Sequence, residues 1–298
     1  MPFQKMAHLQ GSMTALMTPF NAEGEMLLEP IPRLLEFHRQ AGIVGVVSGG
    51  TNGEATSLSV EERKHLLEAL VEQSGDLFVV AGTGATSIAD ARELTRHAAK
   101  IGATAALVLP PFFVKTPSVE GLYGYFSALL DCADIPQILY HIPQFTAVPL
   151  PDELIDRLQS HPNLMGMKDS SGDVEHTLGW LKRYPNLSLF SGSDLIHAQV
   201  YPKGAMGCIS GSANVFPDLI SAIWRGYRED PTGQKMQEAQ DEILRLAKIY
   251  RKYPPIAVNK AILAHKGFPF YHVRPPLVDF SAEMVEALIR ELHEAKFL

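Results

Sequence analysis

Cysteine is scarce in this chain, and the two that are present, Cys132 and Cys208, lie far apart in the sequence. Neither belongs to a CxxC or CxxH pair, which argues against a disulfide framework and a zinc-ribbon site. Basic residues are outnumbered, because 26 Lys and Arg stand against 33 Asp and Glu and give a formal net charge of −7. A chain without a basic excess has little to neutralise a phosphate backbone, so nucleic acid is not an expected partner.

Long apolar runs are missing as well. The longest, over residues 105–114, is interrupted by Pro110 and Pro111 and is too short to cross a bilayer. The first residues, MPFQKMAHLQGSM, lack the continuous apolar core of a signal peptide. These absences predict a cytoplasmic protein without a membrane span.

Nucleotide-binding motifs are incomplete or absent. The segment GTGATS at residues 82–87 begins like a GxGxxG fingerprint but lacks its third glycine, and no GxxxxGK[ST] motif occurs. We interpret GTGATS as a turn between a strand and a helix. The sequence therefore favours a closed barrel over an open, doubly wound sheet.

The chain does contain short apolar runs that alternate with longer segments of helical period. Apolar residues recur at spacings of three and four in segments such as 31–40, 60–72 and 87–100. This alternation is typical of repeated βα units and a parallel sheet. We predict eight strands, over residues 14–17, 45–47, 78–81, 105–109, 137–140, 165–168, 187–190 and 207–209.

The length of 298 residues fits one (β/α)8 barrel, which takes about 250 residues, with a short addition. We therefore predict an α/β protein with a TIM barrel over residues 1–227. A C-terminal helical extension of the same domain is predicted over residues 228–298, with helical patterns in 236–250, 257–264 and 282–296.

The carboxyl ends of the strands converge at one mouth of such a barrel, so polar residues there are candidates for chemistry. The second strand leads into the glycine-rich turn SGGTNGE, whose backbone N–H groups can approach an anion closely. The candidates at strand ends are Thr51 and Asn52 after strand two, Tyr140 on strand five, Lys168 on strand six, Gly192 and Asp194 after strand seven, and Ile209 on strand eight.

Lys168 ends an apolar strand within the run LMGMKDSSGD. Burial of an amine favours its uncharged form, which attacks ketones, and the resulting Schiff base is an electron sink for a carbanion at the adjacent carbon. The alternative is a structural lysine whose head reaches solvent or pairs with Asp169. Tyr140 offers a phenol that can move the protons of such a reaction, unless it is a buried tyrosine bonded only to the backbone.

Other catalytic arrangements have weaker support. His141 and His197 fall near strand ends, but no HExxH or HxH pair is present, and no catalytic metal is expected. The segment SGSD at residues 191–194 does not match the GxSxG elbow of a serine nucleophile. Cys208 lies in an apolar strand, where a buried and inert thiol is expected.

The motifs GGTNGE, PPFF, LYHIP, GMKDSSGD, SGSD and GCIS occur in this order over nearly the whole chain. In this respect the chain resembles the dihydrodipicolinate synthase and N-acetylneuraminate lyase family. The resemblance implies a (β/α)8 barrel with a C-terminal helical extension, assembled as a homotetramer. It also implies an aldolase that forms a Schiff base with pyruvate or another 2-keto acid, without a metal or other cofactor.

The resemblance assigns roles to individual residues. Lys168 is implied to be the Schiff-base lysine, and Tyr140 the proton donor and acceptor beside it. Thr51 and Asn52 are implied to hold the pyruvyl carboxylate through charge-assisted hydrogen bonds. The backbone carbonyl of Ile209 is implied to form part of the pocket wall.

Two aromatic residues depart from the family pattern. Synthases of this family carry an arginine two residues after the YxxP proline, where this chain has Phe145. An apolar ring there leaves a substrate carboxylate unpaired, which disfavours 4-hydroxy-tetrahydrodipicolinate synthase activity. Phe113 replaces the relay tyrosine that the family donates across a subunit interface, so Tyr140 is expected to exchange its proton through Thr51 or water.

Three further positions point to a hydroxylated substrate. Asp194 matches an acid with which N-acetylneuraminate lyases bind hydroxyl groups, and Ser170 matches a hydroxyl residue two positions after their lysine. Leu195 replaces their adjoining glutamate. We therefore expect Ser170, Gly192, Asp194 and Phe145 to contact the substrate, and we favour cleavage of a 2-keto-3-deoxy sugar acid, or a similar 4-hydroxy-2-keto acid, to pyruvate and an aldehyde.

Several alternatives remain open from the sequence. A dehydratase of keto-deoxy sugar acids begins with the same Schiff base, and the phenylalanines near the mouth suit an aromatic hydratase-aldolase. A non-enzyme alternative is a barrel that binds a 2-keto acid only to sense it.

Overall fold

The computed structural model describes residues 9–269 and 271–298, so residues 1–8, which open both the predicted barrel and the segment inspected for a signal peptide, lie outside the described part. Eight parallel strands form a closed barrel in chain order, in which β1 pairs with both β2 and β8. The strands are β1 Gly11–Ala15, β2 Gly45–Ser48, β3 Phe78–Gly82, β4 Ala105–Val108, β5 Gln137–His141, β6 Leu164–Asp169, β7 Ser188–Ser191 and β8 Gly207–Ser210. The predicted TIM barrel is confirmed.

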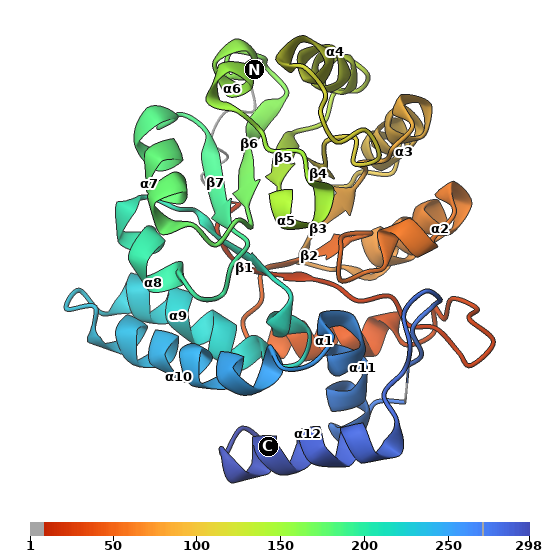
Figure 1. Ribbon diagram of the computed structural model, residues 1–298, viewed down its shortest axis with the longest axis vertical. Coiled ribbons are helices and arrows are strands. Elements are labelled where there is room, and N and C mark those ends of the chain that lie inside the picture. Colours follow the sequence, from red (N-terminus) through yellow and green to blue (C-terminus); the bar gives the residue numbers. More distant parts are fainter. Residues whose placement is uncertain (1–8, 270) are drawn as a thin grey trace.

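Helices surround the strands on the outside of the barrel (Figure 1). They are α1 Ile31–Gln40, α2 Val60–Gln73, α3 Ile88–Lys100, α4 Val119–Leu130, α6 Asp152–Leu158, α7 Val174–Arg183, α8 His197–Val200 and α9 Pro217–Glu229. The short helix α5 Pro143–Thr146 follows β5 and lies over the strands near the centre of Figure 1. Short 3₁₀ turns lie at η1 Ala55–Ser57, η2 Tyr201–Lys203 and η3 Ser212–Asn214. Several helices begin at a capping residue; Ser59, for example, forms a capping box with Glu62 at the start of α2.

The C-terminal segment consists of α10 Gln234–Tyr250, α11 Pro255–His265 and α12 Ala282–Glu294, close to the helical patterns predicted from the sequence. In Figure 1, α10 runs beside α9, and α11 and α12 lie together on the same side of the barrel. α9 itself continues to Glu229, past the predicted barrel boundary at residue 227. No helix in the described ranges is both long enough and apolar enough to cross a membrane.

The first strand begins earlier than the sequence predicts, at Gly11 rather than Thr14. Gly11 and Ser12 are not apolar, but they pair with Gly207 and Cys208 of β8 and are buried by that pairing. A Cβ atom on Gly207 would overlap the carbonyl of Gly11, so this seam of the barrel closes only with a glycine there. The closure of the barrel, rather than local hydrophobicity, therefore sets the start of β1.

Side chains alternate between the inside of the barrel and the helical layer. The interior cluster includes Met13, Val47, Val80, Leu107, Ile138, Tyr140, Met165, Phe190 and Ile209. The outward side chains of the same strands, such as Val46, Val79, Leu139 and Leu189, pack against the helices. This alternation decides which strand-end residues reach the mouth.

Candidate active site

A β-bulge in β6 determines the direction in which Lys168 points. The register between β5 and β6 changes from Gln137 opposite Leu164 to Ile138 opposite Gly166, so β6 carries one extra residue. As a result Met165 packs inside the barrel, whereas Met167 packs outside against the helices. Lys168 then follows on the inner face; with unbroken alternation it would face the helices.

Lys168 lies directly opposite Tyr140 of β5 in the strand register. Both side chains are buried, and Lys168 Nζ lies 4.1 Å from the centroid of the Tyr140 ring. The Tyr140 hydroxyl lies 3.4 Å from Ser170 Oγ, a neighbour additional to the Thr51 or water expected for proton exchange. Amine, phenol and serine hydroxyl thus form one group at the inner ends of β5 and β6.

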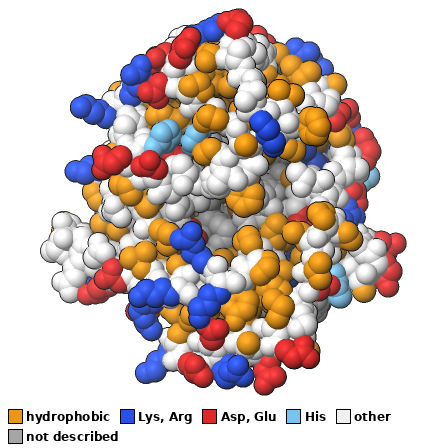
Figure 2. All heavy atoms as spheres, in the orientation of Figure 1, with side chains coloured by type: hydrophobic (Ala, Val, Ile, Leu, Met, Phe, Trp, Pro, Cys, Tyr) orange, Lys and Arg blue, Asp and Glu red, His pale blue; other side chains and the backbone are white. Residues whose placement is uncertain are grey.

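A cavity of about 560 Å³ opens at the carboxyl ends of the strands. All the predicted site residues line it: Thr51, Asn52, Tyr140, Phe145, Lys168, Ser170, Gly192, Asp194 and Ile209. Figure 2, drawn in the same view as Figure 1, shows the molecule hollowed near the centre of this face. The arrangement fits a small organic substrate with its reacting carbon next to the lysine.

Gly192 allows the Lys168 side chain to take this position. A Cβ atom at Gly192 would overlap Ser170 Oγ and would lie 2.9 Å from Lys168 Cε. Gly192 also donates its backbone N–H to the Asp169 carbonyl over 2.7 Å, which ties the ends of β6 and β7 together. The missing side chain is therefore a requirement of the site.

The turn with Thr51 and Asn52 is compact and rich in donors. Gly53 and Ala55 donate their N–H groups to the Gly50 carbonyl, over 3.1 and 3.3 Å. Within the described part of the chain, the backbone N–H groups of Thr51 and Asn52 donate to no other group. Two free donors next to the Lys168 cavity suit a carboxylate.

Asp194 lies at the rim of the cavity in a charged network. Its Oδ1 lies 3.2 Å from His197 Nε2, and its Oδ2 accepts from the Ser212 hydroxyl. Burial lowers the pKa of His197, but contacts with Cys208 and Asp194 outweigh it, so the net shift is upward, to about 10. Burial raises the pKa of Asp194, but bonds to His197 and Ser212 outweigh it and lower the pKa below its ordinary value. A carboxylate anion with spare lone pairs therefore faces the cavity.

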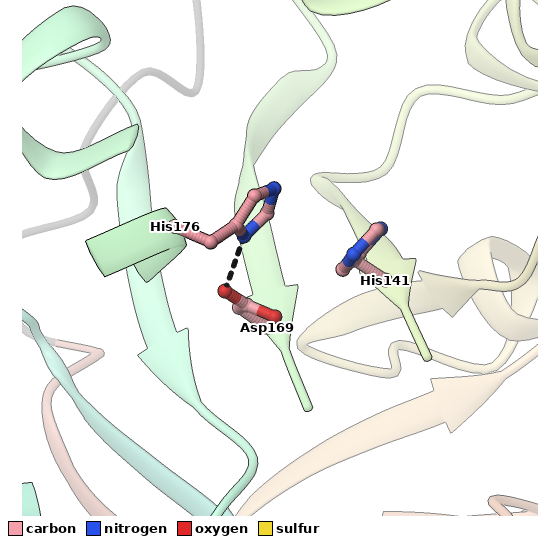
Figure 3. Close-up of side chains that lie close together, drawn as sticks. All are labelled: His141, Asp169 and His176. Carbon is pink, nitrogen blue, oxygen red and sulfur yellow. Dashed lines mark hydrogen bonds and ion pairs between the residues drawn. The ribbon is translucent and has the colours of Figure 1, made fainter. Parts of the chain in front are cut away.

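His141, Asp169 and His176 form a second polar cluster on the outer side of β5 and β6 (Figure 3). In residues 9–269 and 271–298, these are the only His, Cys, Asp or Glu side chains grouped closely enough for a metal, with ligand atoms within 4.8 Å. The Asp169 carboxylate already accepts from His176 Nδ1 over 2.8 Å and from two further donors, and His141 Nδ1 accepts from the Leu150 N–H. These bonds engage the Asp169 carboxylate and one nitrogen of each histidine, so the three residues form a hydrogen-bonded network within the fold.

The bonds of this outer cluster also bear on whether Lys168 pairs with Asp169. Asp169 points away from the cavity and bonds to His176 and Thr177, so it does not hold the lysine at the surface. The hydrogen bond that His176 donates to Asp169 raises the pKa of His176. Burial lowers the pKa of His141 to about 4, which keeps its ring neutral. The cluster anchors the end of β6 directly behind Lys168.

Sequence reasoning missed several residues that line the cavity. Gln144, Ser171, Ser193, Gly211 and Ser212 belong to the loops after β5 to β8. Ile243, Leu246, Ala247, Tyr250, Arg251 and Ile256 come from α10, α11 and the turn between them. The serines stand in the motifs GMKDSSGD and SGSD, which offered a signal. The helical residues carried none, because their period only indicates that one face is buried.

Comparison with known proteins agrees with this geometry. The model of the dihydrodipicolinate synthetase family matches residues 8–295. The chain belongs to this family. It is 37% identical over 289 residues to an uncharacterized DapA-like lyase of Chloroflexus aurantiacus, covering 95% of this chain and 96% of that protein. It is also 37% identical over 296 residues to a 4-hydroxy-tetrahydrodipicolinate synthase of Stutzerimonas stutzeri, covering 97% and 99%.

Solved structures of the family have the same fold. Dihydrodipicolinate synthase from Aquifex aeolicus superposes with a TM-score of 0.90 at 30% identity, covering 97% of this chain and 98% of that one. YagE, a family member from E. coli K12 in complex with pyruvate, gives 0.92 at 26% identity, covering 97% and 99%. The chain is accordingly a carbon–carbon lyase of the class I aldolase type.

Proposed function

We propose that the protein reversibly cleaves a 2-keto-3-deoxy sugar acid, or a similar 4-hydroxy-2-keto acid, to pyruvate and an aldehyde through a Schiff base on Lys168. The main support for this proposal is the position of the Lys168 amine. It is buried 4.1 Å from the centroid of the Tyr140 ring, in the cavity that Thr51 and Asn52 also line. Two family structures were solved with pyruvate, YagE and the dihydrodipicolinate synthase from Acinetobacter baumannii, which supports pyruvate as the keto acid.

The chemistry follows from these positions. The Lys168 amine adds to the C2 carbonyl of the bound keto acid, and loss of water leaves a protonated imine. Tyr140 gives its phenol proton to the departing water and, as a phenolate, removes the proton of the C4 hydroxyl. The C3–C4 bond then breaks, the aldehyde leaves, and the electrons of that bond form an enamine with the imine. Protonation at C3 and hydrolysis of the imine release pyruvate and restore the amine. The Tyr140 hydroxyl exchanges its proton with Ser170 Oγ, its neighbour in the structure.

The far part of the cavity favours a hydroxylated substrate. Ser171, Ser193, Ser212 and Asp194, from the segments that follow β6, β7 and β8, line this part of the cavity. Asp194 can accept hydrogen bonds from substrate hydroxyls, and the serines can donate or accept. The opposite side is apolar, formed by residues of α10 such as Leu246. A short polyhydroxylated aldehyde suits a cavity with hydroxyl and carboxylate groups on one side and apolar residues of α10 on the other.

The alternative is 4-hydroxy-tetrahydrodipicolinate synthase, the name carried by several relatives that are 33–37% identical to this chain. Aspartate semialdehyde brings a second carboxylate, which needs a cation. Phe145 stands where synthases are implied to carry arginine, and the cations among the described lining residues are Lys168 and Arg251. Arg251 is exposed at the C-terminal end of α10. The Phe145 position itself carries no cation, so it favours the sugar-acid substrate.

A comparison of substrates tests the proposal. Purified protein is assayed for pyruvate release from a set of 2-keto-3-deoxy acids, and for condensation of pyruvate with aspartate semialdehyde. We expect a higher kcat/KM for a sugar acid, and gain of condensation only in Phe145→Arg, a change at a side chain that is 60% exposed and so spares the fold. Condensation by the unaltered protein at a comparable rate would contradict the substrate assignment.

We further propose that the protein assembles as a homotetramer. Phe113 and Val114 are largely exposed after β4, and exposed apolar side chains of this kind suit burial against a second copy. Light scattering coupled to size exclusion tests this assembly, and a monomeric mass at micromolar concentration would contradict it.

A further inference from the structure

One C-terminal helix, α11, contacts the turn that carries Thr51 and Asn52. Asn259 of α11 donates from Nδ2 to Asn52 Oδ1 over 3.4 Å, although the residues are 207 positions apart. The next residue, Lys260, donates to Glu54 Oε1 over 2.6 Å, and both of these side chains are buried. The proposed carboxylate site is therefore held from the C-terminal extension as well as from β2.

The hydrogen bonds fix the direction of the Asn52 amide. The Tyr250 hydroxyl lies 2.6 Å from Asn259 Oδ1, a length typical of an O–H···O bond, so Asn259 Oδ1 accepts and its Nδ2 turns toward Asn52. Asn52 Oδ1 accepts in turn. An amide has its acceptor and donors at opposite corners, so the Asn52 NH₂ group is left as the end that points elsewhere.

The Asn52 amide lies beside the cavity. A Cβ on Gly211 would stand 2.7 Å from Asn52 Nδ2 and 3.1 Å from Asn52 Oδ1, and both residues line the cavity, so Nδ2 is the nearer amide atom on the Gly211 side. A flipped amide would present an oxygen there instead. An oxygen repels a carboxylate, whereas the NH₂ group donates to it, so the direction of this amide decides whether the site attracts the keto acid.

The ion pair of Lys260 holds the backbone of the same turn. Glu54 has a left-handed conformation, with φ of 55°, which a non-glycine residue keeps only when its surroundings hold it. Its Oε1 accepts from Lys260 and its Oε2 accepts from the Arg274 N–H over 2.9 Å. Lys260 also donates to the His272 carbonyl. The turn therefore cannot relax without breaking a fully buried ion pair.

We propose that Asn259 is a positioning residue, which orients the Asn52 amide so that its NH₂ group faces the carboxylate of the keto acid. The C-terminal extension thereby takes part in substrate recognition through a relay from Tyr250 to Asn259 to Asn52. This inference rests on the proposed function, because it assigns the Thr51 and Asn52 turn to a substrate carboxylate.

The test is Asn259→Leu, which keeps the shape of the side chain and removes its polar atoms. Schiff-base formation is trapped with cyanoborohydride over a range of pyruvate concentrations and is read by intact mass. We expect the half-saturating pyruvate concentration to rise about tenfold, the scale of one hydrogen bond to a charged group, with the same final extent of trapping. With methyl pyruvate, which has no carboxylate, the half-saturating concentration should not change.

Ile262→Val is the matched control, because it loosens the buried face of α11 without touching the relay. It should lower the melting temperature and leave the half-saturating concentrations of pyruvate and methyl pyruvate unchanged. Tyr250→Phe removes the hydroxyl that fixes Asn259, so it should also raise the half-saturating pyruvate concentration, by a smaller factor. If Asn259→Leu does not fold, Tyr250→Phe replaces it in the test.

Two outcomes would contradict the positioning role of Asn259, and a third would contradict the proposed function. Equal shifts for pyruvate and methyl pyruvate, or an unchanged pyruvate value in both relay variants, would overturn the positioning role while leaving the Schiff base intact. If the unaltered protein traps no pyruvate, the proposed function itself fails and this inference fails with it.

Discussion

Tyr140 and Lys168 occupy opposite positions on neighbouring parallel strands, and the amine of Lys168 lies over the face of the Tyr140 ring at 4.1 Å from its centroid. The ring shields the amine from water, and the phenol hydroxyl extends beyond it to Ser170. Ring and hydroxyl therefore have separable contributions, since the first shapes the site of the amine and the second moves protons.

Replacing Tyr140 by Phe separates these contributions. The ring over Lys168 is kept and the proton-transferring hydroxyl is lost, so kcat for cleavage should fall by roughly 10²–10⁴, the usual contribution of a general acid or base. Trapping of pyruvate on Lys168 should still reach completion, although more slowly. Steady-state kinetics and intact mass on the same preparation check both expectations, and unchanged kcat would remove Tyr140 from the mechanism.

Gly192→Ala should inactivate the enzyme without unfolding it. The new methyl group overlaps Ser170 Oγ and crowds Lys168 Cε, so the amine must move from its position. A displacement of about 1 Å at a reacting group costs on the order of 100-fold in rate, and we expect kcat/KM to fall by at least that factor. The matched control is Gly179→Ala in α7, where nothing lies within 4 Å of the added atom. Equal activity in the two variants would show that the Lys168 position is not constrained in this way.

His197 should make stability decline at alkaline pH. Its pKa is raised in the fold to about 10 from an ordinary 6.5, so its stabilising protonation is fully present below about pH 6.5 and is lost as pH rises toward 10. Asp194, whose pKa is lowered, contributes stability that is lost only as pH falls below its ordinary range. Melting temperatures of the unaltered protein and His197→Gln, measured from pH 5 to pH 10, should converge as pH rises. Parallel curves would rule out a charged His197.

The barrel and the positions of Lys168 and Tyr140 could be predicted because strand ends in such a barrel converge on one mouth. The direction of Lys168 could not, because the β6 bulge at Met165 leaves no mark in an apolar run. The contact of the Tyr140 hydroxyl with Ser170 was not expected either. Several hydroxyl residues fall near the mouth, and only the side-chain positions show that Ser170 Oγ lies 3.4 Å from the phenol.

The contribution of the C-terminal helices lay beyond the sequence for a different reason. Asn259 and Lys260 sit in an apolar helix, where buried polar residues have many explanations, and their partners Asn52 and Glu54 are about 200 positions away. Asp194 was recognised as a candidate ligand, but its ion pair with His197 depends on the fold of the loop after β7. Coordinates are needed for both: the Asn259 and Lys260 pairs are distant in the sequence, and the Asp194–His197 pair, although local, depends on the conformation of its loop.

Covalent trapping tests directly whether Lys168 forms a Schiff base with pyruvate. The protein is incubated with pyruvate and borohydride, and its intact mass and a peptide map are measured, with Lys168→Ala and the exposed-lysine variant Lys203→Ala treated in parallel. If Lys168 is the Schiff-base lysine, we expect one reduced pyruvyl adduct on Lys168 in the unaltered protein and in Lys203→Ala, and none in Lys168→Ala. No adduct in the unaltered protein, or an equal adduct in Lys168→Ala, would contradict that role.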